Sequence, residues 1–122
     1  MPAYEHLKRF FDRNKFQYEE HDNLFAFMVN NINFLAFKNE GPFVQIVILC
    51  DTGGVPREKL LEAANEVNMS KFIVKITINQ DSKGAWCSYE FCPDEHTPDD
   101  LYISIFKVLD DASEEFFSRL RS

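Results

Sequence analysis

The chain has 122 residues, of which 45% are hydrophobic and thirteen are Phe, so it can bury one aromatic core without disulfides or structural metals. Its 13 basic and 20 acidic residues give a formal charge of -7, which argues against nucleic acids and anionic lipid surfaces as partners. We therefore expect a single domain over residues 1–122, with protein partners favoured over nucleic acid or membrane.

The first half of the chain predicts one helix followed by a meander of strands. Ala3, Leu7, Phe10 and Phe11 recur at the spacing of an amphipathic helix. A weak alternation then indicates a short edge strand over residues 15–20. Three stronger strand patterns follow, at residues 24–29, 32–38 and 43–50, separated by the turn-forming stretches NN and NEGP. Nearly every residue of 43–50 is apolar, so we expect a central strand with helices or a partner covering both of its faces.

The second helix is predicted over residues 57–69, after a glycine-containing loop. Leu60, Ala64 and Val67 form its inward stripe, with Leu61 on one flank. Asn68 lies near its end. Residues 72–79 and 85–91 then alternate as two strands joined by the turn QDSKG, and this hairpin should extend the first sheet.

The last helix is expected to begin after Thr97, which we interpret as its cap, and to run nearly to the C-terminus. Its predicted inward stripe consists of Leu101, Ile105, Val108, Leu109, Ala112, Phe116 and Leu120. The complete order is helix, three or four strands, helix, two strands, helix. This order predicts an α+β fold in which three helices accompany an antiparallel sheet of about five to six strands.

The residue types that usually bind metals do not form a metal-ligand pattern in this sequence. Cys50, Cys87 and Cys92 lack CxxC spacing, and the three histidines lie in separate contexts. We expect no catalytic residues, no metal and no cofactor. Free cysteines and a charged N-terminal stretch without an apolar core favour a cytoplasmic protein without a signal peptide or membrane span.

The Asp51–Gly54 loop, with the sequence DTGG, is the strongest motif for an enzyme. Asp-Thr-Gly after an apolar pair looks like the signature of aspartic peptidases. Those enzymes are almost wholly β-structured, whereas a helical pattern begins a few residues after Asp51. We interpret the match as a chance turn sequence.

A second group of residues could form a surface for a partner. Tyr102, Phe106 and Phe117 lie on a flank beside the main stripe of the last helix. Two interpretations remain open: a broad inner face absorbs these aromatic side chains, or they form an exposed strip for a partner. Trp86, which faces away from Cys87 on its strand, raises the same question.

With this order in place, the chain resembles the YbjN-like family of small bacterial proteins, whose fold is that of type III secretion chaperones. The resemblance covers nearly the whole chain. It is carried by residues 65–68, which match the family's Asn-x-x-Asn pattern through Asn65 and Asn68, by the strands in KFIVKITIN and WCSYEF, and by the long closing helix. The resemblance implies an α+β fold with an antiparallel sheet, frequent dimers and no established chemistry, and we expect a protein partner or a homodimer. A simpler role for the two asparagines is to satisfy backbone groups where the helix turns into the strand.

The function hypothesis is therefore a non-enzymatic protein-interaction or chaperone-like module. The alternative is a small-ligand-binding protein or hydrolase that uses the Asp51–Gly54 loop.

Overall fold

The computed structural model describes residues 1–39, 41–71 and 73–121. The helices are α1 (Ala3–Arg13), α2 (Arg57–Ser70) and α3 (Asp99–Arg121). The strands are β1 (Tyr18–Glu20), β2 (Leu24–Val29), β3 (Ile32–Phe37), β4 (Val44–Asp51), β5 (Lys75–Ile78) and β6 (Gly84–Phe91). Within the described residues these strands form one antiparallel sheet in the order β1-β2-β3-β4-β6-β5. The predicted α+β class and element order are confirmed.

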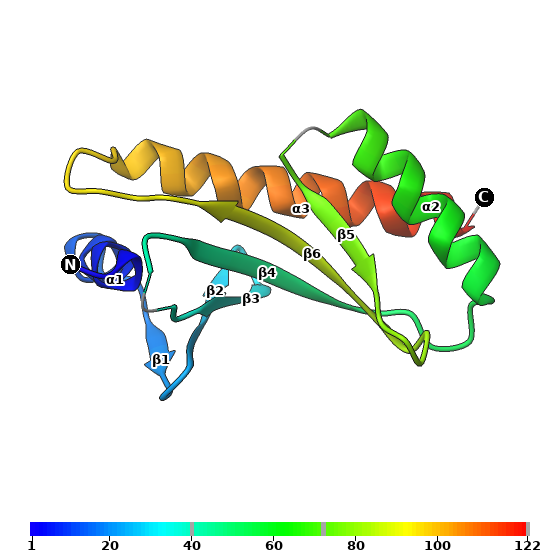
Figure 1. Cartoon of the computed structure of the whole chain (residues 1–122), viewed down its shortest axis with the longest axis horizontal. Helices are drawn as coiled ribbons and strands as arrows, with labels where there is room; N and C mark the ends of the chain where they lie inside the picture. The colour runs from blue at the N-terminus through cyan, green and yellow to red at the C-terminus, as the bar shows by residue number, and fades with distance from the viewer. Residues whose placement is uncertain (40, 72, 122) are drawn as a thin grey trace.

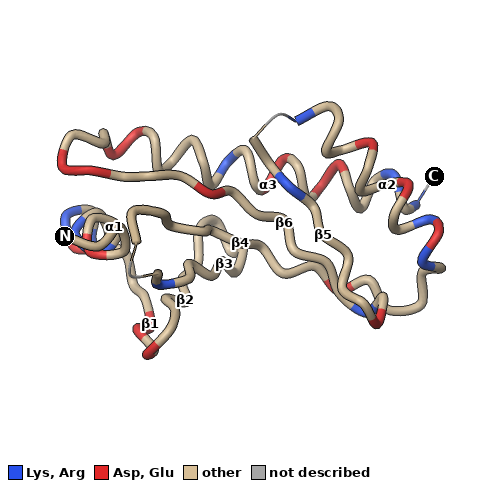
Figure 2. The backbone as a smooth tube through the Cα atoms, viewed as in Figure 1, with Lys and Arg blue, Asp and Glu red and all other residues tan. Residues whose placement is uncertain are grey.

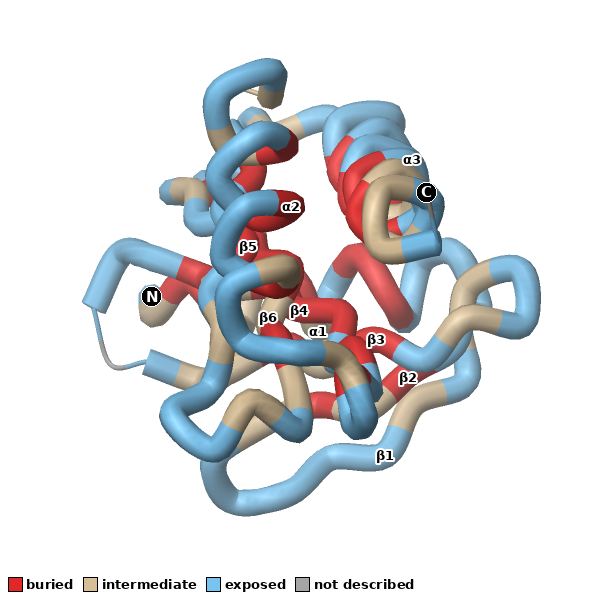
Figure 3. Tube along the Cα trace, turned by 90° about the vertical axis from the view of Figure 1, so that its right-hand side faces the viewer, coloured by how far each residue is buried: buried red, intermediate tan, exposed pale blue. Residues whose placement is uncertain are grey.

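The three helices all pack on one face of the sheet (Figures 1 and 3). On β4, the side chains of Val44, Ile46, Ile48 and Cys50 point toward the helices and are buried. Helix α3 runs along β6, and α2 lies beside β5 (Figure 1). We expected helices or a partner on both faces of β4, but the helices of this chain cover only one. None of the described helices covers the other face of the sheet.

Local sequence explains the sharpest turn of the meander. Asn30 and Asn31 both have positive φ angles, 51° and 67°, as a two-residue turn between antiparallel strands requires. Asparagine tolerates this left-handed backbone better than other non-glycine residues. The turn fixes the pairing of Val29 with Ile32, and with it the register of the whole β2–β3 hairpin.

The core between the helices and the sheet is built from aromatic rings. Phe10 of α1 stacks on Tyr102 of α3, with ring centroids 4.4 Å apart. Phe106 of α3 lies 5.4 Å from both Phe27 on β2 and Phe34 on β3. These contacts join both ends of the chain to the meander, since each aromatic ring buries a large area and pairs with its neighbours.

The inward face of α3 differs from the predicted stripe. Leu101 and Val108 are 39% and 38% exposed, whereas Tyr102 and Phe106 are almost fully buried. The buried residues of α3 are Tyr102, Ile105, Phe106, Leu109, Ala112, Ser113 and Phe116. The helix is turned so that its large aromatic side chains, rather than two aliphatic ones, face the sheet, and this orientation removes more apolar area from water.

The start of α3 also differs from the prediction. Thr97 does not cap the helix through its side chain. Its Oγ1 instead accepts a hydrogen bond of 2.9 Å from the backbone N–H of Asp94, closing a turn before the helix. Asp99 begins the helix, and its carboxylate binds Arg13 and Asn14 at the end of α1. These contacts lower the pKa of Asp99 and link the end of α1 to the start of α3.

Two predicted segments reach beyond the described residues. The strand expected over residues 72–79 begins at Lys75 in the structure, and Phe72 lies outside the described residues. Glu40, in the predicted NEGP turn, also lies outside them.

Candidate interaction surface

The sheet face opposite the helices, which we call the outer face, carries a group of apolar side chains from β2, β3, β4 and β6. Residues that pair directly in adjacent antiparallel strands point to the same face, so the register defines its members. Its apolar members are Leu24, Ala26 and Met28 on β2, Leu35 and Phe37 on β3, Val47 and Leu49 on β4, and Trp86 on β6. The same register places polar or charged residues on this face: Glu19, Asn33, Gln45, Asp51, Lys75, Thr77, Ser88 and Glu90. A group of apolar side chains with none of the described helices over it is the feature of this fold that most needs an explanation.

Two aromatic rings cover the centre of the outer face. Phe37 and Trp86 stack with centroids 5.3 Å apart and an interplanar angle of 18°. Their strands, β3 and β6, lie on either side of β4, so the stacked rings bridge across that strand. Val47 of β4 lies between them and is fully buried. The chain thus closes part of the outer face by itself.

The remainder of the outer face is open. Met28 and Leu49 are 53% and 54% exposed. Within β2, β3 and β4 the only charged residue is Asp51, as Figure 2 shows along these strands, whereas Glu19 of β1, Lys75 of β5 and Glu90 of β6 place charges on the neighbouring strands of the same face. Contiguous apolar side chains bordered by polar and charged ones are typical of protein-binding surfaces.

A cavity of about 920 Å³ continues the outer face at the end of β2. It shares Ala26, Met28 and Leu35 with the outer face, and Phe16 and Tyr18 line its other side. The cavity arises because the pairing of β1 with β2 stops at Tyr18 and Phe27, so the end of β2 runs on beyond β1. Its lining is mainly aromatic and aliphatic, so it would accept an apolar side chain or segment.

The residues predicted for a partner surface lie in different places. Tyr102 and Phe106 are 1% and 2% exposed and belong to the core. Of the two interpretations left open, the broad inner face of α3 is therefore the one that applies to Tyr102 and Phe106. Phe117 is half-buried and packs beside Phe116, with ring centroids 5.7 Å apart. Only Trp86 of this set lies on the outer face.

The sequence did contain a signal for the residues that these predictions missed. In β2 both alternating sets of side chains are apolar, and in β4 the set opposite the core has apolar Val47 and Leu49 at its centre, which indicates strands with apolar side chains on both faces. Met28, Leu35 and Leu49 belong to the set opposite the core. The pattern alone does not tell whether a helix of the same chain covers that set.

The Asp51–Gly54 loop is organised as a connection between β4 and α2. Asp51 is exposed, and its Oδ1 accepts a hydrogen bond of 3.0 Å from the backbone N–H of Gly53. Thr52 is buried and donates its hydroxyl to the carbonyl of Ser82. Gly54 has a φ of +88°, which favours glycine. Each residue of the DTGG motif thus has a role in the turn itself.

The two asparagines of α2 have different surroundings. Asn68 binds both backbone groups of Ile76 on β5: its Oδ1 accepts the N–H at 2.7 Å, and its Nδ2 donates to the carbonyl at 3.0 Å. Asn65 is exposed, and its Nδ2 lies 3.7 Å from the sulfur of Met69. The predicted role of satisfying backbone groups at the helix–strand junction is therefore met by Asn68.

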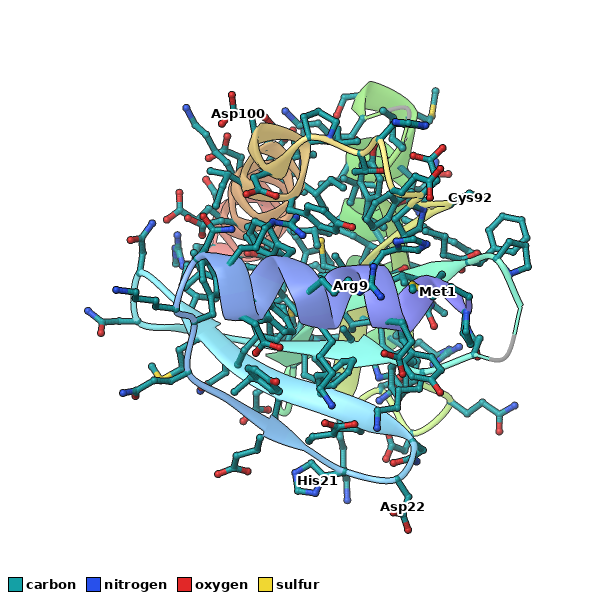
Figure 4. The ribbon with its side chains drawn as sticks, turned by 90° about the vertical axis from the view of Figure 1, so that its left-hand side faces the viewer. Met1, Arg9, His21, Asp22, Cys92 and Asp100 are labelled. Carbon is teal, nitrogen blue, oxygen red and sulfur yellow. The ribbon has the colours of Figure 1, made fainter. Side chains whose placement is uncertain are left out.

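The histidines and cysteines do not converge on a site. His21, beside Asp22, points away from the body of the chain at the tip of the β1–β2 hairpin (Figure 4). Cys50 and Cys87 are buried, and burial raises their pKa values to about 11 and about 12. Over residues 1–39, 41–71 and 73–121, no group of three His, Cys, Asp or Glu side chains is placed to hold a metal ion.

Comparison with known proteins places the fold. The sequence matches no protein-family model and no curated protein. Solved structures of similar fold include three that match over 98% of this chain. An uncharacterized protein from Methanothermobacter thermautotrophicus has a TM-score of 0.70 at 14% identity, over 96% of its chain. YbjN from E. coli has a TM-score of 0.60 at 10% identity, over 89% of its chain.

The third structure is the HopA1–SchA chaperone–effector complex, of which one chain matches with a TM-score of 0.67 at 13% identity, over 94% of its length. The chain has a YbjN-like, chaperone-like fold. At these identities the similarity concerns the fold and leaves the function to be argued from this chain's own residues. Among the helices described, none has the length and apolar character needed to cross a membrane.

Proposed function

We propose that this protein is a non-enzymatic protein-interaction module of the chaperone-like kind, and that it binds its partner on the outer face and in the adjoining cavity. The observation that carries this proposal is the group of apolar side chains on the outer face, with Met28 and Leu49 more than half exposed and none of the described helices above them. Burying such side chains against a partner would release about 25 cal/mol for each Å² removed from water.

The comparisons agree with an interaction role without identifying a partner. One structure of similar fold is the HopA1–SchA chaperone–effector complex. We extend only the general role to this chain, namely that it binds another polypeptide or a second copy of itself in the cytoplasm. Residues 1–122 would act as one domain in this role.

An enzymatic role at the Asp51–Gly54 loop is the weaker candidate. It would require Asp51 to meet other polar groups in a pocket. Asp51 is exposed, and its carboxylate already binds the N–H of Gly53 within the same turn. None of the three described cavities is lined by this residue.

Matched substitutions test the interaction role. Met28→Glu and Leu49→Glu place a charge on the outer face, whereas Met69→Glu and Leu61→Glu place one on α2, where these side chains are 73% and 46% exposed. The four variants should fold alike, because all four positions face water. The tagged proteins are recovered from their native cells, and both oligomeric state and bound protein are measured by light scattering and mass spectrometry.

We expect the two outer-face variants to lose the partner or second copy that wild type retains, while the two α2 variants keep it. The proposal fails if wild type is a strict monomer that retains no partner. It also fails if all four variants keep what wild type binds.

A further inference from the structure

The position of Asn68 has a consequence for the edge of the sheet. Strand β5 is the last strand in the sheet order, so one of its sides has no neighbouring strand among the described residues. A free edge presents unpaired backbone N–H and C=O groups that can pair with a strand of another chain. The Asn68 side chain binds both backbone groups of Ile76, one on Oδ1 and one on Nδ2.

The register shows that the two groups of Ile76 belong to this free edge. In an antiparallel pair, every second residue bonds to the neighbouring strand and the residues between them point their backbone groups away. The N–H of Asn79 bonds to the carbonyl of Gly84, so Asn79 belongs to the set that bonds to β6. Ile76 and Ile78 belong to the alternate set. The backbone of Ile76 therefore faces outward, in the middle of a strand that extends only from Lys75 to Ile78.

The amide of Asn68 makes the two hydrogen bonds that an added strand would make. A primary amide has one donor side and one acceptor side, as a backbone peptide group has. An aspartate at this position would lack the donor, and an alanine would lack both. Apolar side chains lie close by in the sequence: Met69 is 73% exposed and Ile73 is 60% exposed. Without the amide, this edge would combine open backbone groups with apolar surface.

We infer that Asn68 closes the β5 edge of the sheet against pairing with a further strand, and thereby directs partners to other surfaces of the protein. The inference concerns the edge and does not depend on the role proposed for the outer face. It assigns the second asparagine of the Asn-x-x-Asn pattern a role in controlling association, in addition to its local hydrogen bonds.

The test compares Asn68→Ala and Asn68→Asp with Asn65→Ala as the matched control, because Asn65 lies on the same helix without a bond to β5. The probe is a fluorescent peptide with the sequence of residues 73–79, which can pair with an open β5 edge. A second peptide carries Ile76→Pro, which removes the central N–H and prevents pairing. Binding is followed by anisotropy, self-association by light scattering, and the Ile76 amide by hydrogen exchange.

In Asn68→Ala we expect the Ile76 amide to exchange about tenfold faster or more, since it loses its acceptor. We also expect this variant to bind the first peptide but not the proline peptide, and to associate more strongly as its concentration rises. Wild type and Asn65→Ala should do none of these. If Asn68→Ala does not give the near-ultraviolet spectrum of a folded chain, Asn68→Asp takes its place. This variant keeps the acceptor for the Ile76 N–H and frees only the Ile76 carbonyl, so it is judged by peptide binding and self-association and not by hydrogen exchange.

The inference is overturned if the folded Asn68 variant neither binds the peptide nor associates more strongly than wild type. In that case the amide is only a local anchor between α2 and β5. It is equally overturned if wild type binds the peptide, or if Asn65→Ala behaves as the Asn68 variants do.

Discussion

Replacing Phe106 with alanine should cost more stability than a typical substitution in this chain. The ring is 2% exposed and packs against aromatic rings from three other parts of the chain. Its neighbours, at centroid distances from 5.4 to 6.1 Å, are Phe10, Phe16, Phe27 and Phe34. Removing it leaves a cavity where α3, α1 and the β2–β3 hairpin meet.

The expected loss is about 4 kcal/mol in the free energy of unfolding, within the range of about 3–5 kcal/mol measured for buried Phe→Ala substitutions. A domain of this size has about 5–15 kcal/mol in total, so the variant should remain folded but only marginally. With a urea dependence of about 2 kcal/mol per M, the unfolding midpoint should fall by about 2 M.

Urea unfolding followed by circular dichroism and by Trp86 fluorescence measures this loss. Leu101→Ala is the control on the same helix, because Leu101 is 39% exposed, and it should change stability by about 0.5 kcal/mol or less. A loss below about 1.5 kcal/mol for Phe106→Ala would refute the assignment of this ring to the core. It would restore the interpretation of Phe106 as part of an exposed aromatic strip.

Two further predictions concern titrating groups. Hydrogen bonds from Lys38 and Lys8 hold the pKa of Glu20 below its ordinary value of 4.5. The ionised Glu20 therefore stabilises the folded state at pH values above 4.5. This stabilisation is lost as the pH falls through the lower pKa that Glu20 has in the folded protein. Glu20→Gln should therefore be less stable than wild type at neutral pH and equal to it in acid; a difference independent of pH in urea unfolding would contradict this. Because Cys50 and Cys87 are buried with raised pKa values and Cys92 is exposed, a thiol reagent at mildly alkaline pH should modify one cysteine per folded chain and all three after denaturation. Rapid modification of a second cysteine in the folded protein would show that burial does not protect these thiols.

The sequence predicted the structure correctly where a local pattern of residues is compatible with only one backbone conformation. On α1 the apolar residues occupy a narrow stripe, and its predicted members Ala3, Leu7, Phe10 and Phe11 are all buried. The Asn30–Asn31 turn was predictable because few residue pairs tolerate two successive positive φ angles. In both cases the decisive interaction lies within a few residues of the chain.

The sequence was less informative where tertiary packing chose between two local solutions. The apolar arc of α3 is wider than one stripe, so periodicity could not decide whether Leu101 or Tyr102 faces inward. The stack of Tyr102 on Phe10 brings together residues from opposite ends of the chain. Similarly, the two apolar sides of β4 were visible in the sequence, but the placement of all three helices on one side depends on the complete topology.

The candidate surface was predicted only through Trp86. Its stacking partner Phe37 and the exposed residues Met28 and Leu49 have the same alternating pattern as core residues. Only the structure distinguishes the two faces.

Oxidative footprinting of methionine tests the central claim, that a partner covers the outer face, most directly. Met28 on the outer face and Met69 on α2 are 53% and 73% exposed, so both should be oxidised readily in the purified protein. In extracts of the native cell, we predict that Met28 is protected while Met69 is oxidised as fast as before. Equal oxidation of Met28 in the extract and in the purified protein would contradict the account.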